Sequence, residues 1–259
     1  MRRLWPLVPV YVALLLWVDR GVTLHGQYAL GALTWLVLIA AAWTLSPQRR
    51  VQVAVVVVAA TLGEVTGSLI WGVYHYRLNN LPLFVPPAHG LVYLTGIALA
   101  TSLRRHTRWL VVAAAVAAVG WGIAGLTVLP RLDVAGALGV LLLCLFLWRS
   151  RYRATYAGVF FAVAALELYG TAIGTWQWAR AVPGLGIADG NPPSGVASGY
   201  VWFDVTALLL APVLLRLVRS GTARIHNPLE RPVLLEPGAE RLEELPVELR
   251  GFTPDPVAS

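Results

Sequence analysis

Residues 51–76 read VQVAVVVVAATLGEVTGSLIWGVYHY, and residues 154–178 read ATYAGVFFAVAALELYGTAIGTWQW. Each stretch is an apolar run of roughly the 20 residues needed to cross a bilayer, and each contains one glutamate, Glu64 or Glu167. After the glutamate, both stretches have a glycine three residues on, a second glycine, two aromatic residues and then a Pro-Pro pair. An ionisable side chain inside a hydrophobic span is unfavourable and marks a functional site. Two of them in matching places predict the functional centre of the chain.

The composition is that of a membrane protein. The chain has 259 residues, of which 58% are hydrophobic and 13% charged, whereas soluble domains have about 25% charged residues. The mean hydropathy is +0.67. The single cysteine, Cys144, allows no disulfide within one chain. The net charge of +7 comes without a basic stripe interleaved with aromatic residues, so it does not indicate a nucleic-acid partner.

Eight apolar segments predict an all-α, polytopic membrane protein. They are Leu4–Val18, Gln27–Leu45, Val51–Tyr74, Pro86–Leu103, Trp109–Leu129, Asp133–Trp148, Ala154–Trp178 and Ala197–Leu217. The first and sixth are short, so tilt or local thinning of the bilayer has to accommodate them. Pro6 and Pro9 interrupt the first segment and no small-residue cleavage site follows it, which favours a retained span over a signal peptide.

The arginines alternate between the loops and predict the orientation. Clusters of two or three precede the first span, follow the second, fourth and sixth, and end the eighth, whereas each alternate loop has only one arginine. Positively charged loops stay in the cytoplasm. We therefore expect both termini on the cytoplasmic side, in what we interpret as a bacterial inner membrane.

The matching patterns predict a tandem duplication of four spans each, with repeats at residues 1–104 and 105–219. An even number of spans leaves both repeats in the same orientation, so the duplication is parallel. We expect the third and seventh helices to face each other across the pseudo-two-fold axis. Residues 220–259 are rich in Pro and Glu and predict a mostly disordered cytoplasmic tail. The alternative is that this tail docks a partner.

Three carboxyl groups are the candidate catalytic residues. Glu64, Ser68, Trp71 and His75 fall on one face of a continuous helix, as do Glu167, Thr171, Gly174 and Trp178. Asp204 lies inside the eighth span, and we expect the carboxyls of Glu64, Glu167 and Asp204 to converge on one chamber. Small residues flank both glutamates, so the alternative is that two protonated glutamates only join helices by hydrogen bonds. Asp19 and Asp133 are expected to cap helices or meet solvent.

Aromatic residues and one histidine are the candidate substrate-binding groups, because aromatic faces stabilise cations. They are Trp71, Tyr74, His89, Tyr93, Tyr169, Trp178, Tyr200 and Trp202. The alternatives are an aromatic belt at the membrane interface and, for His89, an interfacial hydrogen bond. The loops at 77–85 and 179–196 are expected to cap the chamber. No metal-binding, diphosphate or nucleotide-binding motif occurs in the sequence, so we expect no metal and no cofactor.

The order Glu-x-x-Gly, Gly-x-Tyr-x-Tyr and a loop with proline resembles the integral membrane carotenoid-biosynthesis family that includes carotenoid hydratases. The matching residues are Glu64, Gly67, Gly72, Tyr74, Tyr76 and Pro86, echoed by Glu167, Gly170, Gly174, Trp176, Trp178 and Pro192. The resemblance covers the third and fourth spans and their repeat. It implies a membrane enzyme that acts on a carotenoid-like substrate.

The leading functional hypothesis is an enzyme that acts on an isoprenoid lipid in the membrane. A carboxyl group in a low-dielectric site remains protonated and acts as a general acid on a double bond. The resulting cation leads to a hydratase or other lyase, a cyclase or an isomerase. Glu64 or Glu167 is the expected acid, and Asp204 the ionised partner. The alternatives are a proton-coupled transporter and a non-catalytic assembly or lipid-binding subunit. The sequence does not define the oligomeric state.

Overall fold

The computed structural model describes residues 6–226, with side chains for residues 6–217. The chain divides into two units, Met1–Val218 and Arg219–Ser259, and the fold described here is that of the first. The prediction of a disordered tail lies outside the described residues from residue 227 onward.

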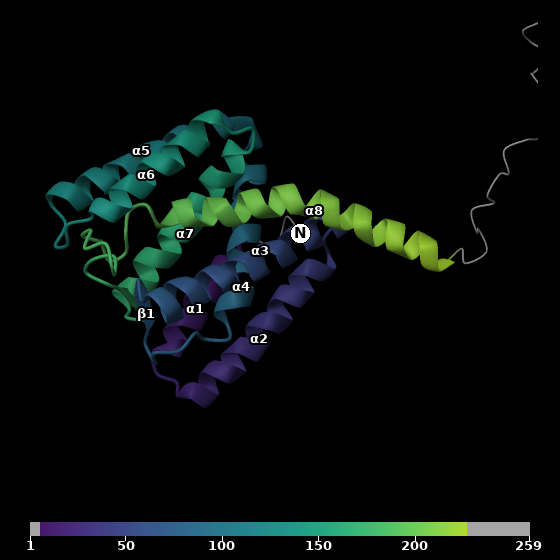
Figure 1. Cartoon of the computed structure of the whole chain (residues 1–259), viewed down its shortest axis with the longest axis horizontal. Helices are drawn as coiled ribbons and strands as arrows, with labels where there is room; N and C mark the ends of the chain where they lie inside the picture. Colours follow the sequence, from purple (N-terminus) through teal and green to yellow (C-terminus); the bar gives the residue numbers. More distant parts are fainter. Residues whose placement is uncertain (1–5, 227–259) are drawn as a thin grey trace, which may run out of the picture. The chain divides into compact units, whose positions relative to one another are not determined.

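The described residues form eight α-helices (Figure 1). They are α1 (Leu7–Asp19), α2 (Leu24–Trp43), α3 (Pro47–Glu64), α4 (Val85–Ser102), α5 (Thr107–Thr127), α6 (Val134–Arg149), α7 (Arg153–Ala172) and α8 (Val196–His226). A π-helical turn, η1 (Val65–Trp71), continues α3, and a 3-10 turn, η2 (Arg104–His106), precedes α5. Each of the eight predicted segments corresponds to one of these helices, which confirms the mostly helical fold.

Five helical segments are long and apolar enough to cross a membrane: Leu24–Trp43, Pro47–Trp71, Arg104–Thr127, Arg153–Ala172 and Val196–Leu217. Helices α1 and α6 are apolar but shorter. Large apolar side chains cover the outside of these helices, among them Leu36, Leu62, Val116 and Leu141, each more than 60% exposed. Exposed apolar surface of this extent is typical of a protein in contact with lipid.

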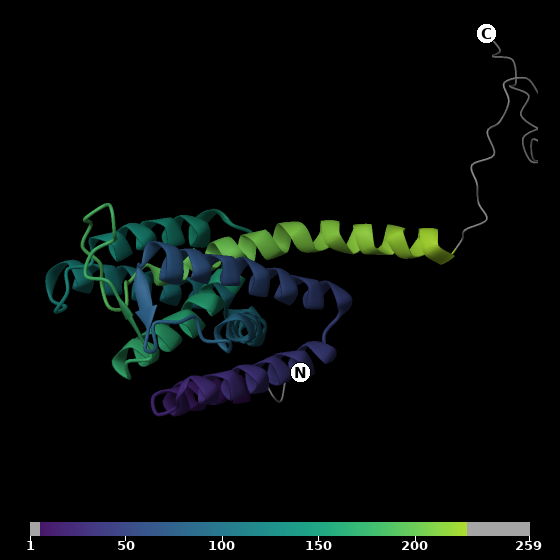
Figure 2. The ribbon, with the colours of Figure 1, turned by 60° about the horizontal axis from the view of Figure 1, so that its bottom comes forward.

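Helix α4 is the centre of the unit. It packs against α1, α2, α3 and α7, and Figure 2 shows α1 and α2 together on one side of it. The closest approach is between α4 and α7, because a Cβ atom on Gly158 would lie only 2.2 Å from the carbonyl oxygen of Gly96. Two glycines at one crossing let the helix backbones touch, as is common where helices pack in lipid. Leu91, Tyr93 and Val163 are buried beside this contact.

The third and seventh helices are shorter than the sequence patterns predict. The predicted segments continue to Tyr74 and Trp178, but the helical structure ends at Trp71 and Ala172. Gly72 has a φ of +74° and Gly174 a φ of +79°. Backbone in this left-handed region is accessible to glycine and ends a helix. The prediction that residues 75 and 178 lie on helical faces is therefore wrong.

The aromatic residues after these glycines form two short strands instead. Strand β1 (Tyr74–Tyr76) pairs antiparallel with β2 (Trp176–Trp178). Tyr74 lies opposite Trp178 and Tyr76 opposite Trp176, with the His75–Gln177 pair at the centre. The two matching sequence patterns thus pair in one two-stranded ribbon. A local two-fold axis through the His75–Gln177 pair relates the two strands.

Candidate functional site

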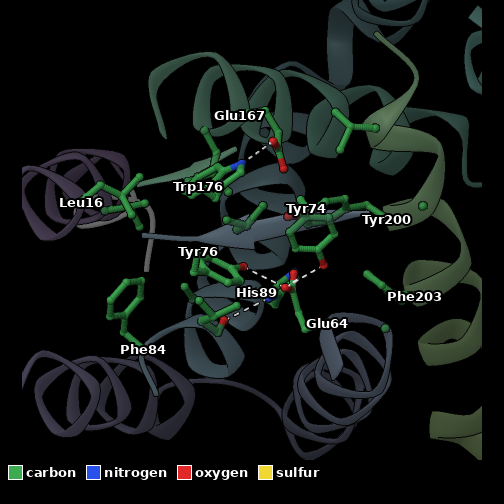
Figure 3. Close-up of a pocket in the computed structure, with 18 of the residues that line it drawn as sticks. Leu16, Glu64, Tyr74, Tyr76, Phe84, His89, Glu167, Trp176, Tyr200 and Phe203 are labelled. Carbon is green, nitrogen blue, oxygen red and sulfur yellow. Dashed lines mark hydrogen bonds and ion pairs between the residues drawn. The ribbon is translucent and has the colours of Figure 1, made fainter. Parts of the chain in front are cut away.

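A cavity of about 170 Å³ lies where the ribbon β1–β2 meets helices α1, α3, α4, α7 and α8. We call it the acid cavity, because Glu64 and Glu167 both line it. The rest of its wall is apolar or aromatic, with Leu16, Phe84 and Phe203 among its residues. Figure 3 shows the two carboxyl groups on opposite sides of the Tyr74 ring.

Glu64 is held by side chains from two elements. The hydroxyl groups of Tyr74 and Tyr76 both donate to Glu64 Oε2, each at 2.8 Å. The other oxygen, Oε1, lies 3.3 Å from Nε2 of His89 on α4 (Figure 3). Only 8% of Glu64 and 6% of His89 are exposed. The buried carboxyl group thus has two tyrosine donors on one oxygen and an imidazole nitrogen beside the other, so its polar atoms are paired in the absence of water.

The contacts of His89 define where its protons lie. Its Nδ1 is 3.0 Å from the backbone carbonyl oxygen of Val85, which only accepts, so Nδ1 carries a proton. Nε2 then either carries a second proton, donated to Glu64, or accepts one from a protonated Glu64. Glu64 Oε1 and His89 Nε2 are therefore placed to share one proton. The imidazole ring stacks on Tyr200 at 5.3 Å between ring centres, which fixes its orientation.

Glu167 has an analogous arrangement with different donors. The indole N–H groups of Trp176 and Trp178 donate to its Oε2, at 2.9 Å and 3.2 Å. An indole N–H only donates, so both contacts favour the ionised carboxylate. In each copy of the pattern the glutamate accepts two hydrogen bonds from the two aromatic residues of the strand that follows it.

The glycines of the pattern make this geometry possible. A Cβ atom on Gly67 would lie 3.1 Å from Cε1 of Tyr74, and one on Gly170 would lie 2.0 Å from Cη2 of Trp176. The missing side chains leave room for an aromatic ring to fold back along the last helical turn and reach the glutamate. These two glycines thus accommodate aromatic rings of their own segment.

The loop that links the ribbon to α8 is anchored by Asp133. Its Oδ1 accepts hydrogen bonds from the N–H groups of Gly136 and Gly190, both at 3.0 Å. Its Oδ2 accepts one from the N–H of Ser194 at 2.7 Å. Asp133 caps α6 as predicted, but it is only 1% exposed. Because Ser194 lies two residues before the start of α8, this anchor also positions Tyr200.

Asp19 is the corresponding anchor near the other loop. It accepts a hydrogen bond from Gln27 at 2.7 Å, and it lies 3.7 Å from Arg77. Its exposure is 0%, so the expectation that Asp19 meets solvent is wrong. Of the two loops expected to cap the chamber, the first lines the acid cavity with Phe84 and Val85, whereas the second reaches it only at Val196, where α8 begins.

Half of the predicted substrate-binding residues lie at the acid cavity. Its lining includes Tyr74, His89, Trp178 and Tyr200. The other four lie elsewhere. Trp71 is 49% exposed and donates to the carbonyl oxygen of Pro183. Trp202 is 53% exposed and packs on Phe146. Tyr93 is buried outside the cavity, and Tyr169 lines a second pocket.

Asp204 is separate from the two glutamates. Its side chain is buried, and it is not part of the wall of the acid cavity. It lies within electrostatic range of the hydroxyl groups of Tyr93 and Tyr156. Its Oδ2 and the Tyr93 hydroxyl have no hydrogen-bond partner within the described residues. The expected convergence of three carboxyl groups therefore reduces to two.

Four aromatic lining residues were not predicted as site residues: Tyr76, Phe84, Trp176 and Phe203. Tyr76 and Trp176 carry a detectable signal, because each alternates with a polar residue in the period of a strand. Phe203 carries none, since apolar aromatic residues are common in membrane helices.

Residues 6–217 contain no group of three or more His, Cys, Asp or Glu side chains that could hold a metal ion. No protein-family model, curated protein sequence or solved structure matches this chain.

Proposed function

We propose that this protein is a membrane-embedded enzyme that transfers the proton of the Glu64–His89 pair to a carbon–carbon double bond of an isoprenoid lipid. The observation that carries the proposal is this proton-sharing pair, with 3.3 Å between Oε1 and Nε2, in the wall of an apolar, aromatic cavity. A general acid has to lie within hydrogen-bonding reach of the reacting group, and the pair borders the space that a substrate would fill.

The opposite wall suits the product of that transfer. Protonation of a methyl-branched double bond gives a tertiary carbocation, and isoprenoids carry such branches. Glu167, held by the two indole N–H groups, supplies a negative charge on the far side of Tyr74. The rings of Tyr74, Trp178 and Tyr200 supply π faces, which attract cations. Glu167 thereby takes the role that the sequence suggested for Asp204.

The reaction balances without a cofactor. The π electrons of the double bond form a C–H bond with the proton from the pair, and the neighbouring carbon becomes the cation. An isomerase results if a neighbouring C–H proton returns to the pair. A cyclase results if a second double bond attacks the cation before that proton loss. A hydratase results if water attacks and returns its extra proton to the pair. The resemblance to carotenoid hydratases favours the last of these.

The location and the internal symmetry belong to the same proposal. We place the protein in a bacterial inner membrane with both termini in the cytoplasm, on the basis of the arginine distribution. The matching hydrogen bonds to Glu64 and Glu167, and the symmetric pairing of β1 with β2, support a parallel four-plus-four duplication.

A proton-coupled transporter is the second candidate, and one observation favours it. A polar pocket lined by Arg77, Arg131 and Gln177 lies against the other face of the ribbon. Tyr76, Trp176 and Trp178 line both this pocket and the acid cavity. A polar solute would therefore have to pass only these aromatic side chains to reach the shared proton.

The proposal is tested by measuring proton transfer from the protein to the carbon skeleton of the isoprenoid. Lipids and pigments extracted from cells with and without the gene would identify the altered isoprenoid. The purified protein would then be incubated with that isoprenoid in D₂O, and deuterium bound to carbon measured by mass spectrometry. Glu64→Gln retains an acceptor for Tyr74 and Tyr76 but removes the transferable proton, so incorporation should fall by roughly 10²-fold. Glu167→Gln retains an acceptor for the indoles but removes the charge, and should also reduce incorporation.

Asp204→Asn is the matched comparison, because it removes a buried carboxyl group outside the acid cavity. All variants would be compared at equal protein level and with an intact thermal transition in detergent. Wild-type deuterium incorporation by folded Glu64→Gln protein would refute the enzymatic proposal. Isoprenoid profiles unaffected by the gene, together with solute-driven proton uptake in proteoliposomes, would favour the transporter.

A further inference from the structure

The acid cavity is too small for a whole isoprenoid lipid. Its volume of about 170 Å³ is close to that of an engineered cavity of roughly 150 Å³ that binds one benzene ring. It therefore accommodates the reacting end of a lipid and little more. The remaining hydrocarbon has to leave the cavity along a surface that tolerates apolar atoms.

A larger apolar pocket lies directly beside it. This pocket, the tail groove, has a volume of about 420 Å³ and lies between α1, α4 and α7. Ala13 lines it from α1, Leu99 from α4, and Phe161, Ala162 and Tyr169 from α7.

Four residues form a common wall between the two spaces. Val12, Leu16, Val92 and Leu166 line both the acid cavity and the tail groove. All four are aliphatic, so a chain that passes between them meets no polar group. Figure 3 shows Leu16 on the side of the acid cavity away from Tyr200 and Phe203.

The lining of the tail groove is almost entirely apolar. It contains no charged side chain, and its polar ones are Thr95 and Tyr169. The Thr95 hydroxyl already donates to the backbone carbonyl of Leu91 at 2.9 Å. The residues that line the groove therefore match a hydrocarbon chain.

We propose that the tail groove holds the hydrocarbon tail of the isoprenoid substrate while its terminal double bond lies in the acid cavity. This inference rests on the proposed function and adds to it a binding mode: one long chain shared between two spaces, reached from the bilayer between α1, α4 and α7. A chain that leaves the bilayer for the groove gains little from the hydrophobic effect, because lipid is equally apolar. Tighter binding of a branched isoprenoid chain than of a straight acyl chain therefore depends on close packing against Phe161 and Tyr169.

Photo-crosslinking tests this placement independently of catalysis. The probe is geranylgeraniol with a diazirine on the chain, added to the protein in detergent–phospholipid micelles. Adducts located by peptide mass spectrometry are expected on the groove segments of α1, α4 and α7. Unlabelled geranylgeraniol should compete them away. A straight-chain palmitate diazirine of similar reach should label the groove much less, and equal labelling by palmitate would overturn the assignment to the isoprenoid tail.

A plug in the groove gives a sharper test. Ala162→Trp and Ala13→Trp each place an indole in the groove, where excess volume has no room to relax. Each should reduce groove adducts by roughly tenfold, because the chain and the indole compete for one close-packed space. A matching prenol diazirine, only one isoprene unit long and therefore short enough for the acid cavity alone, should label the protein as before. The matched controls are Leu168→Trp and Leu14→Trp, which lie on the same helices and are 51% and 59% exposed. Unchanged groove adducts in both plug variants would overturn the proposal.

The outcome also separates this inference from the proposed function. Glu64→Gln should crosslink like the wild type, because binding of the tail does not depend on the shared proton. Groove adducts without any deuterium incorporation would support the tail-binding groove and refute the proposed enzymatic function. Deuterium incorporation with adducts spread evenly over lipid-exposed positions such as Leu36 and Leu62 would support the proposed enzymatic function and refute the tail-binding groove.

Discussion

Two neighbouring buried aspartates are expected to respond to the same substitution in opposite directions. Asp133 and Asp189 are 1% and 2% exposed. Asp133 accepts three backbone N–H groups, whereas Oδ1 of Asp189 has no hydrogen-bond partner within the described residues. Burial and the charge of Asp133 together raise the pKa of Asp189 to about 7, against the opposing effects of the Gly190 N–H and Arg131. Asp133→Asn should destabilise the protein, and Asp189→Asn should stabilise it.

The magnitudes follow from these contacts. In Asp133→Asn the amide group of the new side chain faces the N–H of Ser194, so a buried donor loses its acceptor. Losing a hydrogen bond to a charged group costs about 1.5–3 kcal/mol, which is roughly 5–10 °C in melting temperature for a domain of this size. For Asp189, a pKa raised from 3.8 to about 7 corresponds to at most about 4 kcal/mol of instability at pH 8.

The contribution of Asp189 to folding stability changes with pH in the direction opposite to that of a carboxylate in an ion pair. The folded state holds the Asp189 proton more tightly than the unfolded chain does, so stability falls as the pH rises from 3.8 to about 7 and is constant above that. Asp189→Asn should therefore gain little at pH 4 and most at pH 8.

Thermal unfolding in detergent at both pH values measures these differences. The double variant Asp133→Asn/Asp189→Asn should deviate from additivity, because the two carboxyl groups repel each other. An unchanged transition for Asp133→Asn, or a lower transition for Asp189→Asn at pH 8, would refute the interpretation of this loop.

Three further predictions test the pattern, the third carboxyl group and the topology. Gly170→Ala should destabilise the protein by about 1–3 kcal/mol, because the new Cβ would lie 2.0 Å from the Trp176 ring and overpack it. Gly67→Ala should destabilise it less, because that Cβ would lie 3.1 Å from the Tyr74 ring. Equal melting temperatures of the two variants would contradict this prediction. Asp204→Asn should retain wild-type deuterium incorporation and equal or higher stability, because an amide is less costly to bury than a carboxylate; a large loss of incorporation would return Asp204 to the site. In a cysteine-free background with Cys144 replaced, single cysteines should be labelled from the outside at Asn80 and Ile187 and from the inside at His106 and Tyr152; labelling of residue 187 from the inside would overturn the orientation.

The helices could be predicted from the sequence because their signal is local. Apolar runs of sufficient length are readable directly, and each of the eight predicted segments overlaps one observed helix. The ends of the third and seventh helices were predicted wrongly, although their signal was present. Gly72 and Gly174 are typical helix stops, and the alternation in Tyr-His-Tyr and Trp-Gln-Trp has the period of a strand. Hydropathy outweighed both signals, because the aromatic residues extend the apolar run.

The site was predicted in part, for a different reason. Glu64 and Glu167 stood out because a charge in an apolar run is unfavourable wherever the helix packs. Asp204 satisfied the same criterion, but its distance from the glutamates depends on how α8 packs, which a single sequence does not specify. The crossing of α4 and α7 at Gly96 and Gly158 is a similar case. Neither glycine lies in the repeated pattern, so nothing local indicated that this contact is central.

The two copies of the pattern differ in the donors that hold the glutamate, and this difference assigns the roles. A tyrosine hydroxyl both donates and accepts, whereas an indole N–H only donates. Glu64 therefore has neighbours that can exchange a proton with it: Tyr74, Tyr76 and, at 3.3 Å, His89. Glu167 has donor-only neighbours, and its Oε1 has no hydrogen-bond partner in the described part of the chain. In the proposed mechanism Glu167 therefore supplies the counter-charge, and Glu64 supplies the proton. One ancestral arrangement, once duplicated, would thus give an acid on one side of the cavity and a fixed counter-charge on the other, which is the pair of functions that protonation of an alkene requires.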